Sequence, residues 1–208
     1  MELNKEKREQ LAVLPTGNVA DNNHSSPRQG VMDSGIKPID SKCHMLGRAV
    51  TVKCQPGDNL AIHQGIYAAK PGDVLVCELR GYDQGGHFGD IMALACKVRG
   101  LAGVVLDGSC RDTEDIREMG FPVFSRGINP SGTVKATLGT IGVPVICGGI
   151  EVHDGASSSV IATAWLSFPE SRRTRCLKKH WSNTRRNSTS SNSSSPGRLR
   201  WRSTVLIN

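Results

Sequence analysis

The chain has 208 residues, enough for one α/β domain with a core and a tail, and 38% of them are hydrophobic. No apolar run approaches the roughly 20 residues that span a bilayer, and the charged start lacks the apolar stretch of a secretory signal. The net charge of +7 is uneven: residues 1–170 carry 16 Lys and Arg against 19 Asp and Glu, whereas residues 171–208 carry 10 and no acid. The globular part is therefore slightly acidic, and the basicity belongs to a Ser/Asn-rich tail that cannot bury much apolar surface.

The seven cysteines are scattered along the chain without a Cys-x-x-Cys pair. This argues against a disulfide framework or a zinc site and for reduced thiols. We therefore expect a cytoplasmic protein with no membrane contact. Cys77, Cys96 and Cys147 lie in apolar surroundings and are predicted to be core residues.

Strand and helix patterns alternate between residues 47 and 150, and this order favours an α/β domain. Helix-like segments precede them at 2–14 and 16–21, with a polar loop at 22–29. The elements predicted after these are a strand at 47–54, a helix at 59–69, a strand at 74–79, a glycine-rich loop at 81–89, a helix at 90–98, a strand from 103 that a turn at 107–108 ends, a helix at 113–119, and strands at 121–124 and 143–146.

Within the helix predicted at 90–98, helical spacing suggests that Ile91, Leu94, Ala95 and Val98 face inward.

The end of the strand that starts at 103 is the most informative segment, because it presents Arg111 and Asp112 side by side. Arginine offers a planar fork that matches a carboxylate, and aspartate offers hard oxygen ligands for Mg²⁺ or Mn²⁺. Taken alone, the pair is equally consistent with an ordinary loop ion pair after a core strand.

The glycine-rich loop ends at Gly89, directly before the predicted helix at 90–98. The first N–H groups of a helix lack internal partners and favour anions, so Gly89, Asp90, Ile91 and Met92 could cradle a carboxylate or phosphate. The loop matches neither a P-loop nor a dinucleotide fingerprint, and alone it could be simply flexible. Combined with Arg111 and a cation on Asp112, it would suit a small oxo acid whose enolate a Lewis acid stabilises.

The chain resembles the RraA-like family, which includes the regulator of ribonuclease activity A and class II aldolases acting on 4-hydroxy-4-methyl-2-oxoglutarate. The resemblance covers roughly residues 10–153. It rests on the ordered motifs Thr16-Gly-Asn-Val-Ala-Asp21, Gly47-Arg-Ala-Val-Thr51, Pro71-Gly-Asp-Val-Leu-Val76, Gly89-Asp90, Asp107-Gly-Ser-Cys-Arg-Asp112, Phe121-Pro-Val-Phe124 and Gly142-Val-Pro-Val145.

This resemblance implies an α/β/β swivelling sandwich that assembles as a homotrimer or hexamer. It implies a lyase that cleaves such oxo acids to pyruvate and decarboxylates oxaloacetate, with Mg²⁺ or Mn²⁺ as cofactor. Substrate would bind Gly89, Asp90, Ile91, Met92 and Arg111. Asp112 would ligate the metal, Arg111 and Asp112 would be catalytic, and Asp90 and Asp107 would support metal-bound waters. The alternative is a non-enzymatic regulator of ribonuclease that acts by protein–protein binding. The intact Arg111–Asp112 pair favours the enzyme.

The family pattern stops after residue 154, which divides the chain into an RraA-like domain at 1–154 and a divergent, irregular and disordered tail at 155–208. The codons allowed for residues 160–169 permit, in another frame, the family's missing Asp-x-Asp-Gly-Val-Val-Val segment, which suggests a shifted reading frame. The tail's positive charge is then accidental, and we expect no role in nucleic-acid binding despite its attraction for phosphate. Loss of a core strand and a closing helix would also weaken stability and activity.

Four lone residues have no assigned chemistry. His63 is interpreted as a packing residue, and His87 and His153 as loop residues. Cys110, next to Arg111, could be a reactive thiol.

Overall fold

The computed structural model describes residues 30–161 and 164–168 of the chain. The segments predicted at 2–14, 16–21 and 22–29, and most of the tail, lie outside this range. The helices are α3 (Leu60–Ala68), α4 (Asp90–Val98) and α5 (Thr113–Met119). The strands are β1 (Lys37–Pro38), β2 (His44–Lys53), β3 (Asp73–Glu78), β4 (Gly86–Phe88), β5 (Gly103–Cys110), β6 (Val123–Ile128), β7 (Thr140–Ile141), β8 (Val145–Cys147), β9 (Ile150–Val152), β10 (Ser157–Ile161) and β11 (Ala164–Phe168).

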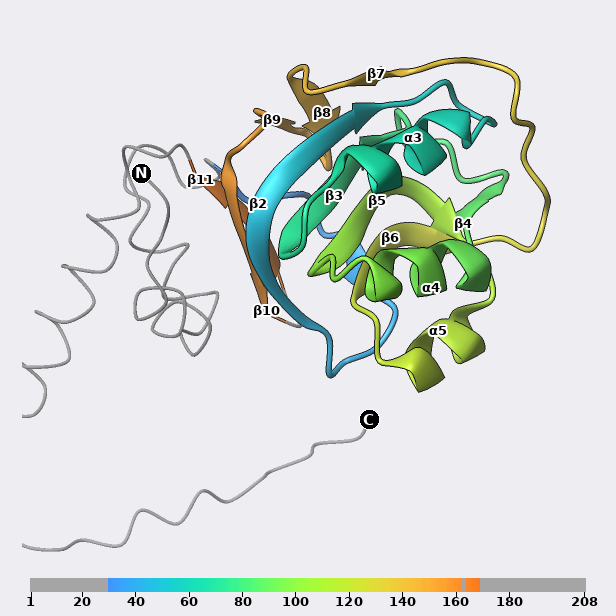
Figure 1. The fold of residues 1–208 in the computed structure, drawn as a ribbon, viewed down its shortest axis with the longest axis horizontal. Coiled ribbons are helices and arrows are strands. Elements are labelled where there is room, and N and C mark those ends of the chain that lie inside the picture. The colour runs from blue at the N-terminus through green and yellow to red at the C-terminus, as the bar shows by residue number, and fades with distance from the viewer. Residues whose placement is uncertain (1–29, 162–163, 169–208) are drawn as a thin grey trace, which may run out of the picture.

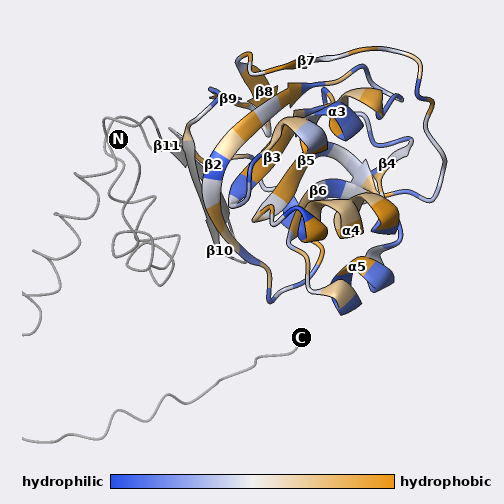
Figure 2. Cartoon of the chain, in the orientation of Figure 1, coloured by the Kyte–Doolittle hydropathy of each residue, from blue (hydrophilic) through white to orange (hydrophobic). Residues whose placement is uncertain are grey.

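One large sheet organises the molecule, in the order β1-β6-β5-β3-β2-β10-β11. Its central strands β2, β3, β5 and β6 are parallel, as βαβ connections require. Strands buried on both faces read as continuous apolar runs, and every residue of β3 and β5 is buried. Both strands are largely orange in Figure 2. The mixed α/β fold expected from the sequence is confirmed.

The sheet has a hydrophobic core on each face. The three helices cover one face (Figure 1), and there Ile62 of α3 and Ala93 of α4 join Leu75 and Leu106 of the sheet. The short antiparallel sheet β8–β9 covers the other face, where Val145 and Cys147 join residues of β3 and β5. These two layers hold the carboxyl ends of the central strands in fixed positions. Among the described residues, no helix is long and apolar enough to cross a membrane.

Strand β5 is longer than predicted. The Asp-Gly pair at 107–108 does not end it, because Ser109 and Cys110 continue to pair with β4 on one side and β6 on the other. The ladder with β6 shifts register between Leu106 and Ser109, so the extra residues form an irregularity within the strand. The predicted glycine-rich loop likewise contains the short strand β4, which the addition to β5 stabilises.

Helix α4 has the predicted position but not the predicted orientation. Ile91, Leu94 and Val98 are exposed by 74%, 52% and 78%, whereas Met92, Ala93 and Cys96 are buried. The small Ala93 and Cys96 side chains allow the helix to lie close to the sheet. The larger apolar side chains therefore form a stripe at i, i+3 and i+7 on the outer face.

The segment from residue 155 onward, which was predicted to be irregular, begins with two strands. β10 pairs antiparallel with β2, and β11 pairs with β10. The reason is that the first half of β2, on the edge that faces away from β3, offers an open row of backbone N–H and C=O groups. The rest of the predicted tail falls outside the described residues.

Candidate functional site

Arg111 and Asp112 directly follow β5 and precede α5. The N–H of Arg111 donates to the carbonyl of Phe88 at 2.9 Å, which fixes this junction against β4. Arg111 Nε lies 3.2 Å from Asp112 Oδ2, and the two side chains keep 41% and 34% of their surface exposed. The predicted pair therefore exists, and a small molecule in solvent can reach it.

Gly89 brings the glycine-rich segment against this pair. A Cβ on Gly89 would overlap Asp112 Oδ2 and lie 3.1 Å from Arg111 Nε. Gly89 also caps α4 without a side-chain hydrogen bond to the first turn. The first N–H groups of α4 are consequently left for an outside acceptor, at the positive end of the helix. Gly89 thus lies next to Arg111 and Asp112, and Asp90, Ile91 and Met92 follow it in the first turn of α4.

The backbone of Asp112 is strained, with φ of 52° and ψ of 40° in the left-handed region. Among the described residues only Arg80 is another non-glycine with positive φ. Asp112 occupies the cap position of α5, but its carboxylate makes no capping bond to that helix. Strain of about 1–3 kcal/mol is typically retained where function requires it. Here the conformation directs the carboxylate to Gly89 and Arg111.

A groove of about 390 Å³ runs between α4 and α5 beside this pair. Its lining is acidic at Asp90, Asp115 and Glu118 and apolar at Ile91, Leu94 and Met119. Arg111 and Asp112 do not line this groove, and Asp90 joins it to Gly89 along the chain. An anionic ligand is better accommodated there if a cation accompanies it.

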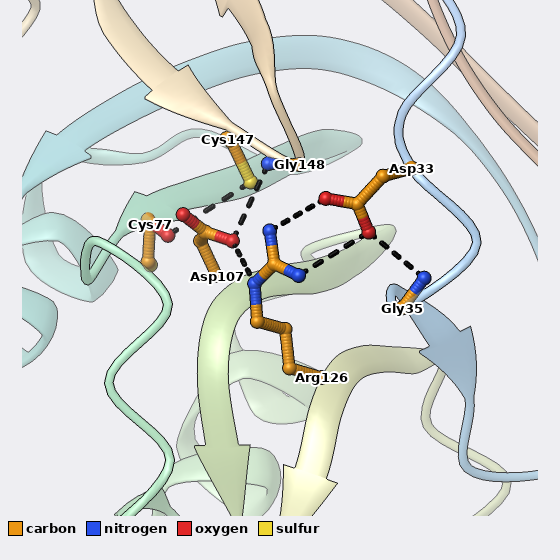
Figure 3. Close-up of polar contacts among 7 residues, drawn as sticks. All are labelled: Asp33, Gly35, Cys77, Asp107, Arg126, Cys147 and Gly148. Atoms are coloured by element: carbon orange, nitrogen blue, oxygen red, sulfur yellow. Dashed lines mark hydrogen bonds and ion pairs between the residues drawn. The ribbon is translucent and has the colours of Figure 1, made fainter.

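Asp107 does not belong to this site. Its side chain is buried on the opposite face of the sheet, where Arg126 Nε donates to Oδ1 at 2.5 Å and the N–H of Gly148 donates to Oδ1 at 3.4 Å (Figure 3). Arg126 also binds Asp33 at 2.7 Å. Burial raises the pKa of Asp107, and Arg126 opposes that change. The expected role of Asp107 beside a metal-bound water is therefore wrong, and Asp107 instead connects β5 to the β8–β9 turn.

His87 is the main residue that the sequence interpretation missed. It is fully buried on β4 and not in a loop, whereas His153 lies in the loop after β9, as predicted. Its signal was hidden because β4 is short and flanked by glycines. Cys110 is also fully buried, and burial raises the pKa of its thiol, so it is not a reactive thiol. Cys77, Cys96 and Cys147 are buried, as predicted.

The described residues contain no group of three or more His, Cys, Asp or Glu side chains suited to hold a metal ion. A divalent ion here would have Asp112 as its protein ligand, with water and substrate oxygens completing the shell. Mg²⁺ commonly binds through one or two carboxylates plus substrate and retains several waters.

Comparison with known proteins identifies the family of this chain. The family model RraA-like (Aldolase/RraA) matches residues 16–158, and the chain belongs to this family. A protein of Halalkalibacterium halodurans named "Putative 4-hydroxy-4-methyl-2-oxoglutarate aldolase" is 37% identical over 124 residues, which cover 60% of this chain and 59% of that protein. A protein of the same name from Ectopseudomonas mendocina is 29% identical over 60% of this chain and 80% of its own length. The chain thus matches about three fifths of the first of these relatives.

Solved structures of RraA proteins share this fold. The RNA-processing inhibitor RraA from Thermus thermophilus superimposes with a TM-score of 0.68 at 25% identity, covering 76% of this chain and 93% of that one. RraAS2 of Streptomyces coelicolor, described as an unusual member of the RNase ES inhibitor family, gives a TM-score of 0.80 at 23% identity over 93% and 99%. The second likeness shows the fold alone.

Proposed function

We propose that this chain is a divalent-metal-dependent lyase that cleaves 4-hydroxy-4-methyl-2-oxoglutarate-type oxo acids to pyruvate and decarboxylates oxaloacetate. The observation that carries the proposal is the contact of Arg111 and Asp112 with Gly89 at the start of α4. One cation, one carboxylate and a row of free amides meet there. Relatives named as aldolases support the same reaction class.

Each residue has a distinct task in this proposal. The guanidinium of Arg111 binds the C1 carboxylate of the oxo acid in a planar, two-bond arrangement. The first amides of α4, from Gly89 to Met92, bind the distal carboxylate, which the helix dipole favours. Holding both ends aligns for cleavage the C3–C4 bond, whose breaking leaves an enolate at C2 and C3. Asp112 holds the divalent ion, which when bound acts as a Lewis acid for the negative charge that develops on the ketone oxygen.

Pyruvate release from oxaloacetate and from 4-hydroxy-4-methyl-2-oxoglutarate tests the proposal. We expect turnover with Mg²⁺ or Mn²⁺, loss with EDTA, and recovery when metal is restored. Arg111→Ala and Asp112→Ala should each reduce kcat/KM by at least about a hundredfold, because each removes a charge that stabilises the transition state. Glu114→Ala is the matched control, since Glu114 is an exposed acid two residues further along the chain.

Turnover that survives EDTA, or an Asp112→Ala variant as active as Glu114→Ala, would contradict the enzyme proposal. In that case the alternative, regulation of a ribonuclease by protein–protein binding, becomes the better proposal. The observation that favours this alternative is the exposed apolar stripe of α4, formed by Ile91, Leu94 and Val98.

The same stripe supports a second part of the proposal, which is assembly into a homotrimer or hexamer. Three large apolar side chains at helical spacing on one exposed face are typical of a contact with another subunit. The stripe begins at Ile91, within the first turn of α4, so a neighbouring subunit would lie close to the substrate cradle.

A further inference from the structure

The buried His87 has no role in the proposed chemistry, yet it lies two residues before Gly89 on the strand that carries the cradle. Its Nε2 accepts a hydrogen bond of 3.0 Å from the N–H of Gly57. Gly57 belongs to the chain that leads into α3, far away in the sequence. The imidazole therefore connects the cradle segment to the start of another helix.

Asn59 makes a second connection between the same two segments. Its Nδ2 donates to the carbonyl of His87 at 3.1 Å and lies 3.7 Å from Met92 Sδ. Asn59 thus contacts both the strand before Gly89 and the first turn of α4 after it. Asn59 is itself buried, and it precedes α3 directly.

The hydrogen bond from Gly57 defines the charge state of His87. A nitrogen that accepts from a backbone N–H carries no proton, so the ring is neutral with its proton on Nδ1. Burial lowers the pKa of His87, while the backbone of Ser109 and Gly85 and the carboxylate of Asp58 oppose the change. Asp58 is occupied by the N–H groups of Leu60, Ala136 and Thr137.

The other titratable group against the ring is the Tyr82 phenol, whose ring meets it edge-on at 5.5 Å. Directly after β5, Arg111 packs on Gly86, one residue before His87. No charged side chain in the described part of the chain forms an ion pair with the ring.

We propose that His87, in its neutral form and together with Asn59, is a positioning residue that holds the substrate cradle in register with Arg111 and Asp112. This inference rests on the function proposed above. Protonation of Nε2 would replace an acceptor by a donor facing the Gly57 N–H, and the connection would be lost. The pKa of His87 is lowered in the folded chain. The hydrogen bond from Gly57 is therefore intact at pH values above the ordinary histidine pKa, and it is lost as the pH falls through the lower pKa of the folded chain.

The kinetic test compares the full-length chain with His87→Gln and His87→Leu between about pH 5 and 8. Glutamine places an oxygen acceptor near the position of Nε2 and does not titrate. We expect His87→Leu to raise KM about tenfold, the equivalent of one lost hydrogen bond, with a smaller change in kcat. His87→Gln should keep the KM of the wild type near neutral pH and lose its rise on the acidic side.

His63→Gln is the matched control, because His63 belongs to α3 and its buried Nε2 has no hydrogen-bond partner among the described residues. The proposal is overturned if His87→Leu changes KM no more than His63→Gln, or if His87→Gln keeps the acidic rise in KM.

Hydrogen exchange of the peptide covering residues 86–94 gives a readout that does not need turnover. We expect faster exchange in His87→Leu and exchange like that of the wild type in His87→Gln and His63→Gln. If the wild type releases no pyruvate but this order of exchange is found, the enzyme proposal fails and the positioning role stands. If turnover is normal and all variants exchange alike, the positioning role fails and the enzyme proposal stands.

Discussion

Gly89 shows how closely one residue determines the site. It has extended backbone, with φ of −133°, so its importance comes from space and not from a conformation that only glycine adopts. Any side chain there would press on Asp112 and Arg111, the two residues proposed to hold the cation and the oxo acid.

Gly89→Ala should therefore reduce activity strongly without unfolding the protein. The added methyl group would displace Asp112 and Arg111, and a displacement of about 1 Å in such a site can reduce the rate on the order of 100-fold. Gly132→Ala is the control, because a Cβ there meets nothing within 4 Å. Pyruvate release and thermal unfolding of both variants check this. Full activity in Gly89→Ala would contradict the proposed position of the substrate.

At the scale of elements, α4 has two proposed functions, substrate binding and subunit contact, and different parts of the helix carry them. Its amino end is the proposed substrate cradle, and its buried face of Met92, Ala93 and Cys96 packs on the sheet. The outer stripe of Ile91, Leu94 and Val98 has no partner among the described residues and lies beside the groove. Exposed apolar patches of this kind are characteristic of interaction surfaces.

Leu94→Glu should convert the proposed homotrimer or hexamer to smaller species, because it places a charge at the centre of the stripe. Light scattering coupled to size-exclusion chromatography measures the mass. Leu138→Glu is the control, because Leu138 is 69% exposed and lies outside α4, shortly before β7. A wild-type chain that is monomeric at all concentrations would refute the assembly, and an unchanged mass for Leu94→Glu would exclude α4 from the interface.

At the scale of the molecule, the central strands and three helices were predictable because buried parallel strands read as apolar runs and the helices between them have clear ends. β5 is longer than predicted because pairing with β4 and β6 outweighs the turn preference of the Asp-Gly pair. The prediction of which α4 residues face the sheet was wrong, because hydrophobicity alone favours large side chains at buried positions. In the structure, close packing of the helix on the sheet places the small Ala93 and Cys96 there.

The candidate site was predictable in part for a related reason. Arg111, Asp112 and Gly89 could be predicted from the sequence because their residue types indicate their chemistry, and the structure brings them into contact. His87, Asn59 and the partnership of Asp107 with Arg126 depend on contacts between segments distant in the sequence. No periodicity along one chain reports such contacts.

The most direct test of the account is electron paramagnetic resonance of Mn²⁺ bound to this chain with oxalate, a planar dianion that mimics the enolate of pyruvate. We predict one Mn²⁺ site per chain, which Asp112→Ala removes and Glu114→Ala retains. Oxalate labelled with ¹⁷O should broaden the Mn²⁺ lines through direct coordination. Mn²⁺ binding that is unchanged by Asp112→Ala, or line widths that do not respond to the label, would contradict the account.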